Sequence, residues 1–129
     1  MALFSRILVG IIGLLSLFSA ARHWFGIEAL VGERGLQAIG DIGRANLRAD
    51  VGGIFLGIGL FAIFAARRQS RVWLAASTLL VGGALLGRFV SVAIDGYSPK
   101  VGLPMLVEAI VIGIFTFAYW SWGKKPEGL

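Results

Sequence analysis

The chain of 129 residues contains no cysteine and a single histidine, His23. Without cysteine it can form no disulfide, no catalytic thiolate and no cysteine-ligated zinc site. The metalloprotease HExxH, the nucleophile GxSxG and the Walker phosphate loop are all absent. The glycines of residues 51–60 lie in an apolar run that lacks the strand and turn of a dinucleotide site. We therefore expect no catalytic residues, no cofactor and no metal.

Charge is also scarce, whereas apolar residues are abundant. Charged residues make up 15% of the chain, hydrophobic residues 57%, and the mean hydropathy is +0.85. These values are typical of a membrane protein rather than a soluble domain. Four apolar stretches, 3–21, 51–66, 72–94 and 101–122, approach the roughly 20 residues that cross about 30 Å of hydrocarbon.

The second stretch reaches spanning length only if its helix begins near Leu47. Strand-like alternation is absent, and the apolar runs are too long for the strands of a membrane barrel. We therefore predict one all-α membrane domain over residues 1–129. Its fold would be a polytopic four-transmembrane-helix bundle with spans at about 3–21, 47–66, 72–94 and 101–122.

The first stretch also fits a second role. Arg6 precedes a short apolar core, which ends in the small residues Ser19, Ala20 and Ala21. This order is typical of a secretory signal peptide, here cleaved before Arg22. Cleavage would leave three spans, and the residues alone leave both roles open.

The longest connection, residues 22–46, has apolar residues spaced loosely like one helical face. They are Ile27, Leu30, Val31, Leu36, Ile39 and Ile42. The connection is also rich in glycine, which favours short, broken pieces; among its glycines are Gly26, Gly32, Gly35 and Gly40. We expect a short interfacial helical segment lying along the membrane surface, either as a simple link or as a lid or docking element.

The basic residues indicate how the chain sits in a membrane. In a four-span arrangement one side receives Arg6, Arg67, Arg68, Arg71, Lys124 and Lys125, and the opposite side mixes its arginines with acidic residues. Cytoplasmic loops carry the excess of Lys and Arg. We predict a multi-pass protein of the bacterial inner membrane with both termini cytoplasmic. The net charge of +5 comes from residues at span boundaries that form no stripe, so nucleic acid is not an expected partner.

Two ionisable residues fall inside predicted spans, Arg88 in the third and Glu108 in the fourth. A charge near the bilayer centre costs roughly 2.5 to 3.5 kcal/mol, so each needs compensation. Their midpoint in the sequence is Ser98, in the turn of residues 95–100. In an antiparallel hairpin they therefore lie at equal depth, about 15 Å from the turn. A direct ion pair between Arg88 and Glu108 follows.

Other polar residues lie near this pair. The second span starts on the same side of the membrane and brings Arg48 and Asp50, while Ser91 and Asp95 share a helical face with Arg88. We predict one polar pocket with His23 near its mouth and with the candidate ligand-binding residues Arg48, Asp50, Arg88, Ser91, Asp95 and Glu108. It either binds an anionic or polar group, such as a lipid or quinone head group, or is a structural ion-pair network.

Small residues recur four apart in two spans. The pairs are Gly53 with Gly57 and Gly83 with Gly87. Such spacing lets helix backbones approach closely. We expect these glycines to serve helix packing, within the chain or between copies.

The chain contains, in order, Leu47-Arg48-Ala49-Asp50-Val51-Gly52-Gly53, Gly87-Arg88, Asp95-Gly96 and Glu108. This set resembles the bacterial DUF4345 family of small four-helix membrane proteins, over about residues 45–112. That family has no established activity, so the resemblance implies a fold and signature residues rather than a reaction. A looser similarity in size and helix number to DoxX-like proteins, some associated with quinone-linked redox systems, is an analogy only.

Together these features predict a non-enzymatic membrane protein that binds a lipid, quinone or other small amphiphile at the charged pocket. The alternative is an accessory or assembly subunit of a larger membrane complex, with the charges as a structural network. An enzyme would need Glu108 or Asp50 as a buried acid or base. The expected partners are the lipid bilayer, a lipid or quinone ligand, and a further copy of the chain or a larger membrane complex.

Overall fold

The computed structural model describes residues 1–33 and 35–123, and this part of the chain is helical without strands. The elements are α1 (Ala2–Phe25), α2 (Ile27–Glu33), α3 (Gly40–Asn46), the π-helical turn η1 (Leu47–Val51), α4 (Gly52–Arg68), α5 (Arg71–Asp95) and α6 (Pro99–Ser121). Four helices in this part are long and apolar enough to cross a membrane: Ala2–Phe25, Gly40–Arg68, Arg71–Asp95 and Pro99–Ser121. The predicted all-α, multi-pass four-helix bundle is confirmed.

The turns between the long helices follow from local sequence. Gln69 ends α4 in the left-handed conformation, with φ 53°, and the hydroxyl of Ser70 then caps α5 by accepting from the backbone N–H of Trp73. Gly96, with φ 88°, ends α5. Ser98 caps α6, whose first residue is Pro99, a position where its missing N–H costs nothing.

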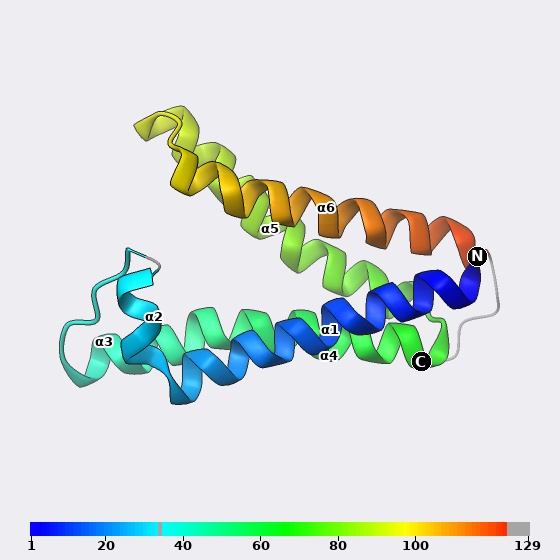
Figure 1. Ribbon diagram of the computed structural model, residues 1–129, viewed down its shortest axis with the longest axis horizontal. Coiled ribbons are helices and arrows are strands. Elements are labelled where there is room, and N and C mark those ends of the chain that lie inside the picture. The colour runs from blue at the N-terminus through cyan, green and yellow to red at the C-terminus, as the bar shows by residue number, and fades with distance from the viewer. Residues whose placement is uncertain (34, 124–129) are drawn as a thin grey trace.

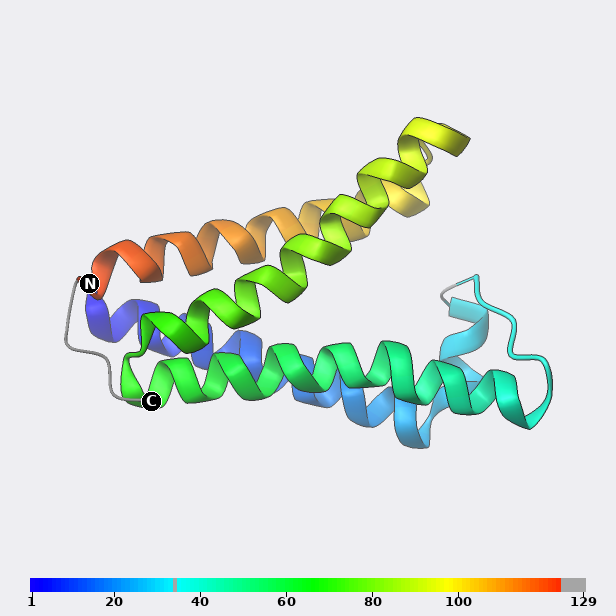
Figure 2. The same cartoon turned by 180° about the vertical axis from the view of Figure 1, so that it is seen from behind.

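The long helices form two antiparallel pairs. α1 packs along α4 and α5 along α6, and further contacts join α4 to α5 and α1 to α6. Figures 1 and 2 show that the pairs lie together at one end and diverge toward the other. We call the first the closed end: it holds the start of α1, the α4–α5 turn and the end of α6. The open end holds the α5–α6 turn, α2 and α3.

The core lies toward the closed end. Its buried apolar residues come from all four long helices: Val9, Ile58, Ala62, Ala65, Leu74, Val81, Phe115, Ala118 and Trp122. The pairs are also tied by hydrogen bonds, since the Trp122 indole N–H donates to Ser5 Oγ over 2.9 Å and Ser77 Oγ donates to the Ile58 carbonyl over 3.0 Å. Helix α1 is thus an integral part of the bundle.

Arg6 fastens α1 to the end of α4. Its Nε donates to the Ala66 carbonyl over 2.7 Å, and its Nη2 to the Arg67 carbonyl over 3.1 Å. The last carbonyls of a helix have no partner within the helix and carry partial negative charge. A guanidinium supplies both hydrogen-bond donors and positive charge, so Arg6 serves as a C-terminal cap of α4 that is supplied by a different helix.

Glycines make a close contact between α1 and α4, although not the glycines predicted. A Cβ at Gly59 would lie 2.9 Å from the Gly13 carbonyl oxygen, and one at Gly13 would lie 3.1 Å from the Gly59 oxygen. Of the predicted packing glycines, Gly57 lies against Leu80 of α5. A Cβ added at any of the others would meet nothing within 4 Å, which argues against a packing role inside one copy of the chain for Gly53, Gly83 and Gly87.

The helix that contains the second span begins at Gly40, ahead of the start expected near Leu47. Elements α3, η1 and α4 form one continuous helix, Gly40–Arg68, of 29 residues. At 1.5 Å per residue it is about 43 Å long, which exceeds the hydrocarbon thickness. Residues up to Asn46 were expected to lie along the membrane surface, whereas α3 continues the helix of α4. An i,i+3 ion pair of 2.6 Å between Asp41 and Arg44 supports this first turn.

The rest of the connection is the short helix α2, followed by residues 36–39 without regular structure. Glu33 at the end of α2 forms an ion pair of 3.1 Å with Arg22, in the last turn of α1. Ile27 is buried, whereas Leu36, Ile39 and Ile42 are exposed. The side chains of Leu30 and Val31 lie outside the described part of the chain, as do Lys124 and Lys125 entirely.

Candidate functional site: a cavity between the helix pairs

A cavity of about 330 Å³ lies between the two helix pairs. All four spans line it, and ten of its fourteen lining residues are apolar, among them Ile12 of α1, Ile58 of α4, Val81 of α5 and Val111 of α6. Its size and apolar walls resemble those of small-molecule sites, which begin at about 300 Å³. The four polar lining residues are Ser16, Ser19, Arg88 and Glu108.

Arg88 and Glu108 form the ion pair predicted from the sequence. Arg88 Nε donates to Glu108 Oε1 over 2.9 Å, which joins α5 to α6 on one wall of the cavity. The Arg88 side chain is 34% exposed and that of Glu108 15%. The two residues lie at corresponding depths because the turn around Ser98 is symmetric between them.

The pair leaves hydrogen-bonding capacity unused. Glu108 Oε2 is buried and has no partner among the described residues, and neither Nη group of Arg88 has one there either. Buried polar groups are rarely left in this state, because the loss of hydration costs free energy. An oxygen-bearing group placed in the cavity could use this capacity.

Arg48 and Asp50 do not join the pair. Arg48 Nε donates to the Trp24 carbonyl over 2.9 Å, and the Trp24 indole donates to the Arg48 carbonyl over 3.0 Å, which fastens the end of α1 to η1. Asp50 is exposed, and neither residue lines the cavity, although Val51 does. The sequence prediction assumed regular α-helical spacing, whereas the π turn adds a residue and rotates the preceding side chains to another face.

Ser91 and Asp95 also lie away from the cavity. Ser91 is half-buried one turn beyond Arg88, and Asp95 is exposed at the last position of α5. Neither lines the cavity. They share a helical direction with Arg88 as predicted, but here the helix pairs have already diverged, so no opposing wall faces them (Figure 2). Of the six predicted pocket residues, the structure brings together Arg88 and Glu108.

His23 is buried between α1 and α4 rather than placed at the mouth of the cavity. Its Nδ1 lies 2.6 Å from the Ser19 carbonyl and therefore carries the proton, and its ring stacks on Phe55 with the centroids 5.2 Å apart. Nε2 is buried without a partner in the described chain. Because Phe55 lines the cavity and His23 does not, His23 supports the wall from behind.

Sequence reasoning missed the contribution of α1. Ser16 and Ser19, three residues apart on one helical face, place hydroxyl groups on the cavity wall opposite α5 and α6. The signal was present, since polar residues within an apolar span usually face the bundle interior.

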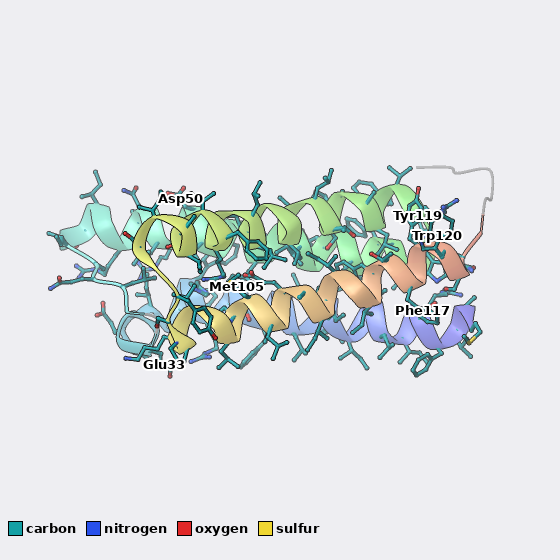
Figure 3. The ribbon with its side chains drawn as sticks, turned by 90° about the horizontal axis from the view of Figure 1, so that it is seen from above. Glu33, Asp50, Met105, Phe117, Tyr119 and Trp120 are labelled. Carbon is teal, nitrogen blue, oxygen red and sulfur yellow. The ribbon has the colours of Figure 1, made fainter. Side chains whose placement is uncertain are left out.

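The described charges outside the cavity divide between the two ends of the bundle. The closed end has four arginines and no described acidic residue: Arg6, Arg67, Arg68 and Arg71, the last with its guanidinium 3.7 Å from the Tyr119 ring centroid. The open end carries five acids against four described bases. Figure 3 shows Asp50 and Tyr119 toward opposite ends of the molecule.

No group of three or more potential metal-ligating side chains lies together within residues 1–33 and 35–123. Comparison with protein-family models, curated proteins and solved structures finds no match to this chain. The resemblance to the DUF4345 family therefore stays a prediction.

Proposed function

We propose that this multi-pass membrane protein binds a lipid, a quinone or another small amphiphile in the cavity between its helix pairs. The observation that carries the proposal is the Arg88–Glu108 pair, a single charged corner in a cavity whose other walls are mostly apolar. An amphiphile matches this division, with its polar group at the pair and its chain along Ile58, Val81 and Val111.

Two features favour a binding role over a purely structural one. First, the ion pair joins α5 to α6, which are already adjacent through a short turn, and does not link the two helix pairs. Second, Glu108 Oε2 is buried without a partner, whereas a network selected for stability should satisfy its buried groups. The Nη groups of Arg88 also lack a partner in the described chain, and they can donate hydrogen bonds to a ligand in the cavity.

We also propose that the protein resides in the bacterial inner membrane with its closed end and both termini on the cytoplasmic side. The four arginines at the closed end support this orientation, because Lys and Arg are enriched on the cytoplasmic side and no described acid opposes them there. The end at which the helix pairs diverge then lies on the opposite side of the membrane (Figure 1).

Native mass spectrometry of protein extracted in mild detergent tests the binding proposal. Wild type should retain an amphiphile, and Arg88→Gln should lose it while keeping its helical circular dichroism. Thr116→Val is the matched control, because Thr116 is exposed on α6 and bonds only to its own helix at Ile112. Wild type that carries no amphiphile even after incubation with lipid extract would contradict the proposal.

One observation favours an accessory or assembly subunit as a second candidate. Gly83 and Gly87 of α5 are exposed, and a Cβ added at either would meet nothing within 4 Å. This leaves room for a helix of another chain to approach closely. Copurification of a stoichiometric protein that is lost on Gly87→Leu, with the cavity empty, would favour this function over ligand binding.

A further inference from the structure

The polar lining of the cavity has no net formal charge, and this limits what it can bind. Arg88 contributes a positive charge, Glu108 a negative one, and Ser16 and Ser19 contribute neutral hydroxyls. The remaining lining residues are apolar. Free positive charge lies instead at the closed end, on residues such as Arg67.

An anionic head group is poorly matched to this lining. It would gain hydrogen bonds from the Nη groups of Arg88, but it would bring a second negative charge beside Glu108, which accepts from the same guanidinium. Both charges would then share one countercharge in apolar surroundings, where unbalanced charge is expensive. A cationic head group meets the converse difficulty at Arg88.

An uncharged head group that carries both donors and acceptors uses every polar group available. The Arg88 Nη groups donate to its oxygen acceptors, and the Ser16 and Ser19 hydroxyls both donate and accept from the α1 wall. Glu108 Oε1 accepts from Arg88 Nε, and a carboxylate oxygen has a second lone pair with which it can also accept from a ligand hydroxyl.

We infer that the cavity selects uncharged, hydroxylated amphiphiles, with hydroxyl donors next to oxygen acceptors as in a monoacylglycerol, over fatty-acid anions and phospholipids of the same chain length. This inference rests on the proposed function and adds the class of ligand. The discriminating element is Glu108, which accepts from the ligand hydroxyl and repels an anion.

The test compares three oleoyl compounds that differ only in the head group. Monooleoylglycerol has donors and acceptors, methyl oleate has acceptors alone, and oleate is an anion at about pH 9. Affinities are measured by equilibrium dialysis of radiolabelled ligand against the full-length protein in nanodiscs of neutral lipid. Wild type should bind monooleoylglycerol at least about tenfold more tightly than either other compound, because only monooleoylglycerol can form hydrogen bonds with both charged residues of the pair without adding a charge.

Glu108→Gln tests the reason for the preference. Glutamine keeps an acceptor for Arg88 Nε but removes the negative charge, so the corner becomes positive and oleate should now bind more tightly than monooleoylglycerol. Thr116→Val should keep the wild-type order. Should Glu108→Gln fail to fold, Ser19→Ala replaces it, because it removes one hydroxyl without altering the pair. It should lower the monooleoylglycerol affinity several-fold and the methyl oleate affinity by less, since methyl oleate has no hydroxyl from which Ser19 could accept.

Each outcome has a distinct meaning. Tighter binding of oleate by wild type, equal binding of all three compounds, or an unchanged order in a folded Glu108→Gln protein would overturn the inferred selectivity and leave amphiphile binding standing. If Ser19→Ala replaces Glu108→Gln, an unchanged preference for monooleoylglycerol over methyl oleate would likewise overturn the inferred selectivity. Failure of all three compounds to bind wild type would contradict the proposed function itself.

Discussion

Adding one methyl group at Gly59 should separate α1 from α4. A Cβ there would lie 2.8 Å from Leu17 Cγ and Cδ2 and 2.9 Å from the Gly13 carbonyl oxygen. Carbon atoms pack at about 3.5–4.0 Å, so the new Cβ and the Leu17 side chain must move apart by about 0.7 Å. Leu17 can turn aside, but the Gly13 oxygen belongs to the backbone, and therefore α1 itself has to move.

The expected cost of Gly59→Ala is about 1–3 kcal/mol, the usual range for an added methyl in a tight contact. The better helix propensity of alanine offsets at most about 1 kcal/mol of this. Gly53→Ala is the matched control on the same helix, because a Cβ at Gly53 meets nothing within 4 Å. The control should be neutral or slightly stabilising.

The assay is unfolding by sodium dodecyl sulfate in mild detergent, followed by circular dichroism at a helical wavelength. Gly59→Ala should shift the midpoint to lower denaturant, whereas Gly53→Ala should not. Equal stability of the two variants would refute the claim that α1 and α4 are held together at the Gly13–Gly59 contact.

Three further predictions follow from contacts at the closed end and from its charge. Arg6→Gln removes two hydrogen bonds to the last carbonyls of α4 and should destabilise the bundle by about 1–3 kcal/mol, measured by the same unfolding assay. Trp122→Phe loses its bond to a buried hydroxyl of α1 and should destabilise by a similar amount, whereas Trp120→Phe, at an exposed position, should not; equal effects would contradict the assignment. In spheroplasts, an impermeant maleimide should label Tyr97→Cys at once but Arg67→Cys only after lysis, and the reverse pattern would contradict the proposed orientation.

The spans could be predicted because length and apolarity alone decide them. A run such as residues 101–122 has no alternative that satisfies its backbone in hydrocarbon. The start of the second span was harder, since Gly40 and Gly43 argue against a helix by propensity. The helix nevertheless begins earlier than expected, and the ion pairs of Arg44 with Asp41 and with Glu28 of α2 offset part of that weak preference.

The sequence predicted the ion pair of the site but not the positions of the other predicted pocket residues. The Arg88–Glu108 pair follows from a symmetric hairpin, where depth depends only on the distance along the chain. Arg48 and Asp50 belong to a different pair of helices, and their direction depends on a π turn that leaves no clear signal in sequence. The spacing of Gly53 and Gly57 likewise did not reveal the close contact of Gly13 with Gly59.

Cysteine protection tests most directly whether an amphiphile occupies the cavity. Because the chain has no cysteine of its own, a single Ala84→Cys reports from the cavity wall and Leu86→Cys from an exposed position on the same helix. Monooleoylglycerol should slow alkylation by N-ethylmaleimide several-fold at position 84 and leave position 86 unchanged. Equal rates at position 84 with and without ligand, or an equal slowing at both positions, would contradict binding in the cavity.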